Sequence, residues 1–174
     1  VLERLDPISG AVEPIMHAEG DYVPDRLFED DAGNVWFCFH GGLGRYVPAS
    51  DALRVWHAED AAEAASPDDC LTVLQAAGGL VWSVSAYHGV QARDREGALL
   101  ETVLPGGDSG LLPGARLEHA QRAPDGGLWI AGEQGLVMWN AGARAFQPVP
   151  GAPAEPTGAF VLQGRDRAWL TRSG

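Results

Sequence analysis

Asp30 to Pro48, with the sequence DDAGNVWFCFHGGLGRYVP, decides the fold, because it encodes two strands and two turns in nineteen residues. Its first five residues favour a turn, since Gly33 and Asn34 tolerate a positive φ angle and an Asp side chain can bond the turning backbone. The run from Val35 to Phe39 is β-branched and aromatic, which is typical of a strand. His40-Gly41-Gly42 then interrupts the run, and a second extended pattern follows it.

The same order of turn, apolar strand and glycine-containing break recurs along the whole chain. Each copy has a tryptophan in the strand, and these are Trp36, Trp82, Trp129 and Trp169. Their spacings are 46, 47 and 40 residues. A period of about 40–50 residues with several short strands per copy is typical of β-propeller blades, each of which is a small antiparallel sheet.

The two ends of the sequence each hold half of a copy. Val1 to Gly10 matches the second half, as comparison with residues 42–51 shows, and 41 residues lead from Trp169 through the joined ends to Trp36. We therefore predict an all-β propeller of four four-stranded antiparallel blades, the last one completed by both termini. The alternative is a slice or half of a larger propeller with seven or eight blades. The predicted blades are residues 24–57, 70–104, 115–149, and 158–174 plus 1–16.

Composition and charge exclude several classes of partner. With 45% hydrophobic residues, 23 Gly and 12 Pro, the chain is globular and rich in turns. A formal net charge of −12 argues against binding to nucleic acids or anionic membranes, because both are bound mainly through Lys and Arg. No apolar run reaches the length that spans a bilayer, so we expect no membrane insertion by this chain. Without an initiator Met or a secretory leader, we expect a processed chain or an excised piece.

The cysteines and histidines do not form a metal or cofactor motif. Two cysteines are too few for a disulfide framework, and Cys38 is interpreted as a small apolar residue of a buried strand. A disulfide from Cys38 to Cys70 between neighbouring blades is the less favoured alternative. The spacing of His, Cys and carboxylate residues is not typical of a metal site, and there is no nucleophile elbow or phosphate-binding loop. We expect no cofactor, no metal and no catalytic residues.

The loops differ between the two ends of the predicted blades. Turns between first and second strands and between third and fourth strands are short, and they share one end. The other end carries the turns between second and third strands and the connections between blades, which are long at residues 58–69, 106–114 and 151–158. Binding residues concentrate on long loops held by a rigid scaffold, so we expect the functional face at this end. The candidate ligand-binding residues are His40, Tyr87, His88, Glu133 and Arg172 near these turns, and Arg122 on an inner strand expected to line the channel.

The repeat resembles a known family. Its pattern of Asp, a small residue, Gly, a polar or small residue, an apolar residue and Trp, then Gly-Leu-x-Arg and Asp-Pro, is similar to the two-component regulator propeller repeat. The clearest copies are Asp30 to Pro48 and, for the second half, Gly174 joined to Leu2 to Pro7. The third copy has Met138 in place of the Arg, and the second copy has Ala76-Ala77 in place of the acidic turn.

This resemblance implies a bacterial sensor propeller in a periplasmic or extracytoplasmic position, ahead of a membrane segment and a signalling output domain. We therefore expect a non-enzymatic sensory or binding module that recognises a small ligand or a partner protein on its long-loop face. One alternative is a propeller enzyme of the lyase or hydrolase type with its site at the channel mouth, since fold does not fix function. Another is a structural repeat fragment that associates with a second copy as a homodimer.

Overall fold

The computed structural model describes residues 2–16, 23–24, 26–57, 70–111, 115–164 and 167–172. Its regular structure consists of strands, apart from two short 3-10 turns at Ala77–Gly79 and Gly107–Ser109. Three complete blades, each an antiparallel sheet of four strands in meander order, follow one another along the chain. Blade 1 contains β3 (Arg26–Glu29), β4 (Val35–Phe39), β5 (Gly42–Val47) and β6 (Ala52–His57). Blade 2 contains β7 (Cys70–Gln75), β8 (Val81–Ser85), β9 (Gly89–Arg93) and β10 (Leu99–Val103). Blade 3 contains β11 (Leu117–Arg122), β12 (Leu128–Gly132), β13 (Gly135–Asn140) and β14 (Ala145–Pro148).

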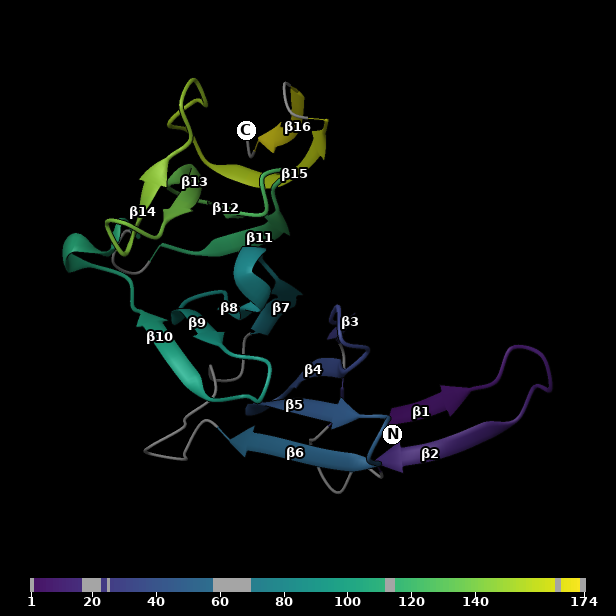
Figure 1. Ribbon diagram of the computed structural model, residues 1–174. Helices are drawn as coiled ribbons and strands as arrows, with labels where there is room; N and C mark the ends of the chain where they lie inside the picture. The colour runs from purple at the N-terminus through teal and green to yellow at the C-terminus, as the bar shows by residue number, and fades with distance from the viewer. Residues whose placement is uncertain are drawn as a thin grey trace.

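The blades are arranged along an open arc (Figure 1). The first strands β3, β7 and β11 lie on the inner side of the arc and contact one another in sequence order. The last strands β6, β10 and β14 lie on the outer side. The prediction of an all-β propeller with four-stranded antiparallel blades is therefore confirmed.

The terminal strands form two separate sheets. β1 (Leu2–Leu5) pairs with β2 (Val12–Met16) beside blade 1, and β15 (Thr157–Gln163) pairs with β16 (Arg167–Arg172) beside blade 3. They lie at opposite ends of the arc, so in the described residues they do not complete one blade between them (Figure 1). Each pair packs on the neighbouring blade, and the rotation over three blades does not bring the ends together. The structure is that of a partial propeller, which agrees with the alternative of a slice.

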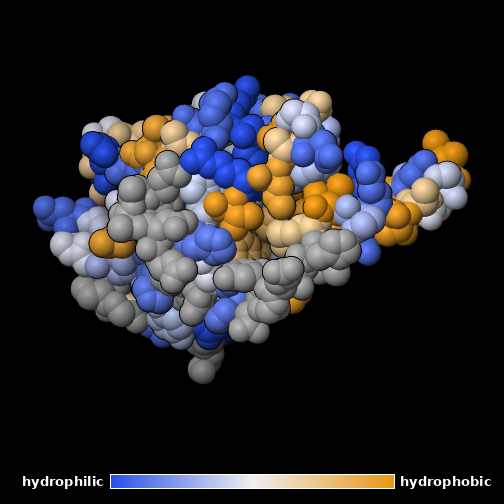
Figure 2. Space-filling view, turned by 90° about the horizontal axis from the view of Figure 1, so that it is seen from below, coloured by the Kyte–Doolittle hydropathy of each residue, from blue (hydrophilic) through white to orange (hydrophobic). Residues whose placement is uncertain are grey.

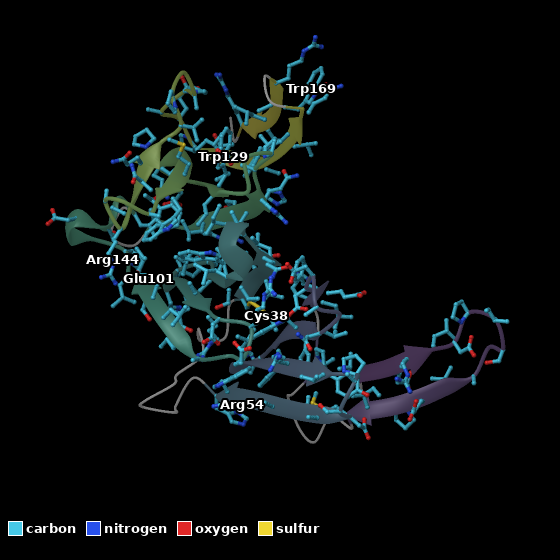
Figure 3. The ribbon with its side chains drawn as sticks, viewed as in Figure 1. Cys38, Arg54, Glu101, Trp129, Arg144 and Trp169 are labelled. Carbon is cyan, nitrogen blue, oxygen red and sulfur yellow. A yellow bond between two sulfur atoms is a disulfide. The ribbon has the colours of Figure 1, made fainter. Side chains whose placement is uncertain are left out.

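The core consists of apolar layers between neighbouring blades. Trp36 and Trp56 stack at 5.8 Å between blades 1 and 2, and Trp82 contacts Trp139 at 5.2 Å between blades 2 and 3. The repeated tryptophans of the first two copies are fully buried, as their spacing predicts for core residues. Trp169 is 68% exposed and points away from the arc (Figure 3). Trp36 is buried against blade 2, whereas among the described residues no blade follows the β15–β16 sheet, which explains the exposure of Trp169.

Asp30 holds the first turn of blade 1 together. It is buried, and its carboxylate accepts hydrogen bonds from the backbone N–H groups of Ala32 and Asn34, the Asn34 side chain and the Trp36 indole, the indole bond being 2.9 Å long. Gly33 takes the positive φ of 79° that the turn requires. Burial by itself would raise the pKa of Asp30, but the hydrogen bonds outweigh it and leave the pKa below its usual value. The Asp of the repeat is thus a structural residue.

Polar contacts connect the blades at the short-turn end. The Gln75 side chain accepts from the Asp31 backbone N–H at 2.9 Å, and Arg95 donates to the Asp31 carboxylate at 2.8 Å. These bonds join blade 2 to the first turn of blade 1. On the outer rim, the Arg144 guanidinium of blade 3 makes a two-bond ion pair with Glu101 of blade 2, at 3.0 and 2.9 Å (Figure 3).

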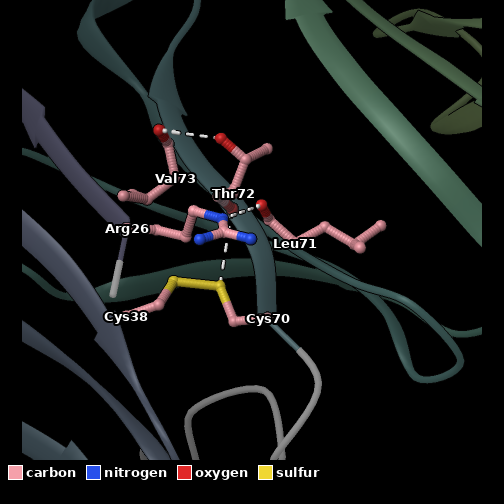
Figure 4. Close-up of a disulfide and its surroundings, with 6 residues drawn as sticks. All are labelled: Arg26, Cys38, Cys70, Leu71, Thr72 and Val73. Atoms are coloured by element: carbon pink, nitrogen blue, oxygen red, sulfur yellow. Dashed lines mark hydrogen bonds between the residues drawn. A yellow bond between two sulfur atoms is a disulfide. The ribbon is translucent and has the colours of Figure 1, made fainter. Parts of the chain in front are cut away.

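Cys38 and Cys70 form a disulfide between blades 1 and 2 (Figure 4). The interpretation of Cys38 as a simple apolar residue is therefore wrong. Cys38 is the fourth residue of β4 and Cys70 the first residue of β7, so both lie toward the same end of neighbouring sheets, with their Cα atoms 6.1 Å apart. Arg26 lies above the bridge and donates to the Leu71 carbonyl at 3.2 Å. Sequence spacing alone could not show this, because the contact depends on how two blades face each other.

Candidate functional site

The predicted site residues come from the turns between the second and third strands of successive blades. We call the end of the arc that carries these turns the long-loop face. His40 follows β4, Tyr87 and His88 follow β8, and Glu133 follows β12, so antiparallel pairing places all four at this end. Their side chains are exposed. Residues 58–69, the longest connection assigned to this face, lie outside the described part of the chain.

Two of the six predicted residues, Arg122 and Arg172, do not lie in these turns. Arg122 ends β11, where it pairs with Leu128 beside the short turn before β12, so it lies at the opposite end of blade 3. Arg172 ends β16 at the long-loop face, but its side chain forms an ion pair at 2.8 Å with Glu155, which precedes β15. We call the sheet of β15 and β16 the terminal sheet. Arg122 was predicted as a site residue because it lies on an inner strand that was expected to line the channel. That position does not fix the height of a residue along the channel.

The turn after β8 is held by its own hydrogen bonds. The Ser85 hydroxyl accepts from the His88 backbone N–H at 3.0 Å and lies 3.4 Å from Nδ1 of the same imidazole. This arrangement fixes the His88 ring against the end of β8. Tyr87, beside it, is 51% exposed, so much of its ring is accessible to a ligand. A large amphipathic side chain on a fixed turn is a common contact residue.

Backbone hydrogen bonds connect the turn after β8 to blade 3. The Leu117 backbone N–H donates to the Ala86 carbonyl at 2.8 Å, which fastens the start of β11 to the turn. Arg116 precedes β11, and its carbonyl accepts from the Glu133 backbone N–H at 3.0 Å. The Arg116 backbone N–H in turn donates to the Glu133 carboxylate at 3.3 Å. The turns of blades 2 and 3 therefore lie side by side.

A cluster of charged and polar side chains results, which we call the blade 2–3 cluster. Besides the bonds above, the Arg116 guanidinium forms an ion pair with Glu118 at 3.3 Å. Both partners are accessible to solvent, so the pair adds little stability and both groups can also reach a ligand. The cluster combines a cation, two carboxylates, an imidazole and a phenol. Its members are Ser85, Tyr87, His88, Arg116, Glu118 and Glu133.

Sequence reasoning found only part of this cluster. Tyr87, His88 and Glu133 were predicted from their places in the turns, whereas Arg116 and Glu118 were not. The sequence feature that could have indicated Arg116 and Glu118 is a pair of opposite charges where a long connection between blades meets an inner strand. His119, the next residue on β11, contacts Phe160 edge-on at 5.1 Å, and burial lowers its pKa. It is therefore part of the packing between blade 3 and β15.

A groove of about 590 Å³ lies elsewhere, between blade 3 and the terminal sheet. It is lined mainly by apolar residues of β12, β13 and β16, together with residues 149–153. No predicted site residue lines it. The groove exists because β15 and β16 form only half of a blade. Among the described residues, no three His, Cys, Asp or Glu side chains cluster as metal ligands would, and no helix is long and apolar enough to cross a bilayer.

No protein-family model matches this sequence, and no curated protein matches it. Solved structures nevertheless share its fold. The extracellular domain of a protein described as a hybrid two component system from B. thetaiotaomicron has a TM-score of 0.70 at 14% identity, over 88% of this chain and 22% of that chain. Virginiamycin B lyase from Staphylococcus aureus has a TM-score of 0.71 at 14% identity, over 98% and 55%. YCF48 bound to D1 peptide has a TM-score of 0.61 at 13% identity, over 93% and 52%.

At these identities the similarity shows the fold alone. The chain spans 22% and 55% of the length of the first two of these proteins, which agrees with a partial propeller. The resemblance to the two-component regulator propeller repeat has support at the level of the fold, because extracellular domains of two-component systems are among the similar structures. The same fold is also present in a lyase.

Proposed function

We propose that the chain is a non-enzymatic binding module of a bacterial sensor, which recognises a small ligand or a partner segment on its long-loop face. The blade 2–3 cluster is the observation that carries this proposal. Tyr87 offers an exposed aromatic surface, and Arg116, Glu118 and Glu133 offer charges of both signs within one hydrogen-bonded arrangement. A ligand that carries both an anionic and a cationic group beside an apolar part, such as an amino acid or a short peptide, fits this chemistry.

An extracytoplasmic position is part of the proposal. The disulfide between Cys38 and Cys70 supports it, since such bonds persist in oxidising compartments and are rare in the cytosol. The similarity to the extracellular domain of a two-component system supports it at the level of the fold. A signal would arise if a ligand bound two arrangements of the blades with unequal affinity.

The test is a binding screen with matched variants. Amino acids, short peptides and sugars would be screened by thermal shift, and each compound that binds would be measured by calorimetry. Tyr87→Ala and His88→Ala should each weaken its binding by about tenfold or more, because each removes a contact from the cluster. Arg122→Ala is the control, since it removes a charge at the opposite end of blade 3 and should leave the affinity unchanged.

Two results would contradict the proposed site. One is an affinity that Tyr87→Ala, His88→Ala and Glu133→Ala all leave unchanged. The other is an affinity that falls with Arg122→Ala and with none of these three. Circular dichroism of each variant would show that the fold is retained, so that a loss of binding reports on the site.

A lyase-type or hydrolase-type enzyme is the second candidate. His88 and Glu133 favour it, because they lie on neighbouring blades and are residue types that can act as acid and base. An enzyme would convert the bound compound, and His88→Ala would then abolish product formation. Mass spectrometry of the ligand after incubation with the protein distinguishes the two candidates, since a binding module returns the ligand unchanged.

A further inference from the structure

The sheets at the two ends of the arc hold two strands each, whereas a complete blade holds four. Among the described strands, β16 has a neighbour on one edge only, as does β1 at the other end of the arc. The terminal sheet holds two strands where each complete blade holds four, and the groove of about 590 Å³ lies next to it. An unpaired strand edge beside an apolar groove is a surface onto which further strands can add. The β1–β2 pair projects from the body of the molecule, and hydrophobic and hydrophilic residues lie side by side near its tip (Figure 2).

Contacts at blade 1 show what the groove lacks. Leu2 of β1 is buried against Phe37 and Tyr46, which lie on the second and third strands of the next blade. Leu136 is the repeat equivalent of Leu2 in blade 3, and it lines the groove. The equivalent of Phe37 there is Leu170 on β16, which also lines the groove. No described residue occupies the position equivalent to Tyr46.

Leu5 of β1 is that equivalent residue. In the repeat, Leu2 to Leu5 corresponds to residues 43–46, so Leu5 takes the place of Tyr46. Its side chain is 61% exposed, although β1 and β2 are packed on blade 1 through Leu2, Ile15 and Met16. The surface of β1 and β2 that faces away from blade 1 therefore carries the side chain that the groove lacks.

A second pair of exposed residues matches in the same way. Trp36 of blade 1 is fully buried and lies in one apolar cluster with Val73 of blade 2. The equivalent of Trp36 at the end of the arc is Trp169, 68% exposed, and the equivalent of Val73 at the start is Leu27, 61% exposed. A blade-to-blade contact between the two ends would bury both.

We propose that the edge of β16 and the adjacent groove bind the β1–β2 pair of a second copy of this chain. β1 would then pair with β16 in the register of blade 1, where Trp36 is opposite Arg45, so that Arg4 lies opposite Trp169. The Arg45 guanidinium lies over the Trp36 ring at 5.6 Å, and Arg4 is placed to do the same over Trp169. Leu5 enters the groove against Leu136 and Leu170.

A second copy fits better than the chain's own β1–β2 pair. The chain's own pair is packed on blade 1 at the far end of the arc, and it would have to leave that contact to reach β16 (Figure 1). In a pair of copies related by a two-fold axis, each β1–β2 pair stays on its own blade 1 and fills the groove of the partner. Sixteen strands are described in one chain. Two chains have thirty-two described strands, the number in eight blades of four, and each β15–β16 pair would form one four-stranded blade with the β1–β2 pair of the partner.

Light scattering with matched variants tests this inference. The 18.4 kDa chain should have a solution mass twice that value, and Leu5→Asp and Trp169→Asp should each return it to the mass of one chain. Leu100→Asp is the control, because Leu100 is similarly exposed at 53% but lies on β10, the outer strand of blade 2. That variant should retain the doubled mass. Far-UV circular dichroism would verify that the variants are folded.

A cysteine cross-link tests the register. Leu5 should lie opposite Ala168 of the partner, as Tyr46 lies opposite Val35 in blade 1. A mixture of Leu5→Cys chains and Ala168→Cys chains should oxidise to a species of two chains, and neither variant should do so alone. A monomer at every concentration, a dimer that Leu5→Asp and Trp169→Asp leave intact, or an open series of larger assemblies would each overturn the proposal. So would a link that closes within one chain carrying both cysteines, which would show a four-bladed ring.

Discussion

Removal of the disulfide between Cys38 and Cys70 should cost the chain a large part of its stability. The two cysteines are 32 residues apart, and the bond restricts the unfolded chain by closing a loop of that size. Loop-closure entropy then predicts a loss of about 3.7 kcal/mol in the free energy of unfolding at 25 °C. For a chain of this length, that loss corresponds to roughly 7–15 °C in the unfolding temperature. The variant to make is Cys38→Ala/Cys70→Ala, because alanine places no polar group in the buried position of Cys38.

Urea unfolding followed by tryptophan fluorescence measures this loss, and calorimetry measures the shift in unfolding temperature. A reducing agent should lower the stability of the natural sequence to the level of the double variant and should leave the double variant unchanged. A loss below about 1 kcal/mol would refute the reasoning, since the loop would then not limit the unfolded chain. Two free thiols in the folded protein, detected by mass spectrometry after alkylation without reduction, would refute the disulfide itself.

Three further predictions concern buried or half-buried residues. Asp30→Ala should lower the free energy of unfolding by about 2–4 kcal/mol in urea titrations, because Asn34 and Trp36 lose their buried acceptor. The pKa of Asp30 is lower in the folded state than in the unfolded state. Its stabilising effect is therefore present above about pH 4 and disappears as the pH falls through the folded-state pKa. Burial lowers the pKa of His119, so the folded state binds fewer protons than the unfolded state. The unfolding temperature should therefore fall as the pH is lowered from about 7.5 to about 5.5, and it should fall less in His119→Gln. An equal fall in that variant would contradict this prediction. Trp36→Ala should lower the free energy of unfolding by about 3–5 kcal/mol, whereas Leu100→Ala, at an exposed position, should change it by no more than about 0.5 kcal/mol. Similar losses for both variants would show that the layer between blades is not the core.

The fold of each blade could be predicted from the sequence because its signals are local. Turn residues such as Gly33 and the apolar run from Val35 to Phe39 lie within a few residues of the strands that they define, and the structure places β4 at Val35–Phe39. The period of the tryptophans shows that the unit repeats. The prediction that both termini complete one blade was not local, since it depended on the angle between blades. That angle arises from packing in the layers around Trp36 and Trp82, which no residue pattern encodes directly.

The candidate site could be predicted only in part for a similar reason. The face was inferred from the alternation of turns, which places His40, His88 and Glu133 at the same end of the arc. Which of these side chains lie close together depends on contacts between blades. The 2.8 Å bond from the Leu117 backbone to the Ala86 carbonyl, for example, joins the turns of blades 2 and 3. Arg116 enters the site through that junction, so its position in the sequence alone did not suggest it.

The bond between blades 1 and 2 also decides how the chain would behave when its backbone is cut. The disulfide joins the two blades toward the long-loop face, and the bonds of Asp31 with Gln75 and Arg95 join them at the other end. A protease that cleaves any peptide bond between Cys38 and Cys70 would therefore leave two fragments that remain covalently attached. They would migrate as one species on a non-reducing gel and separate only after reduction.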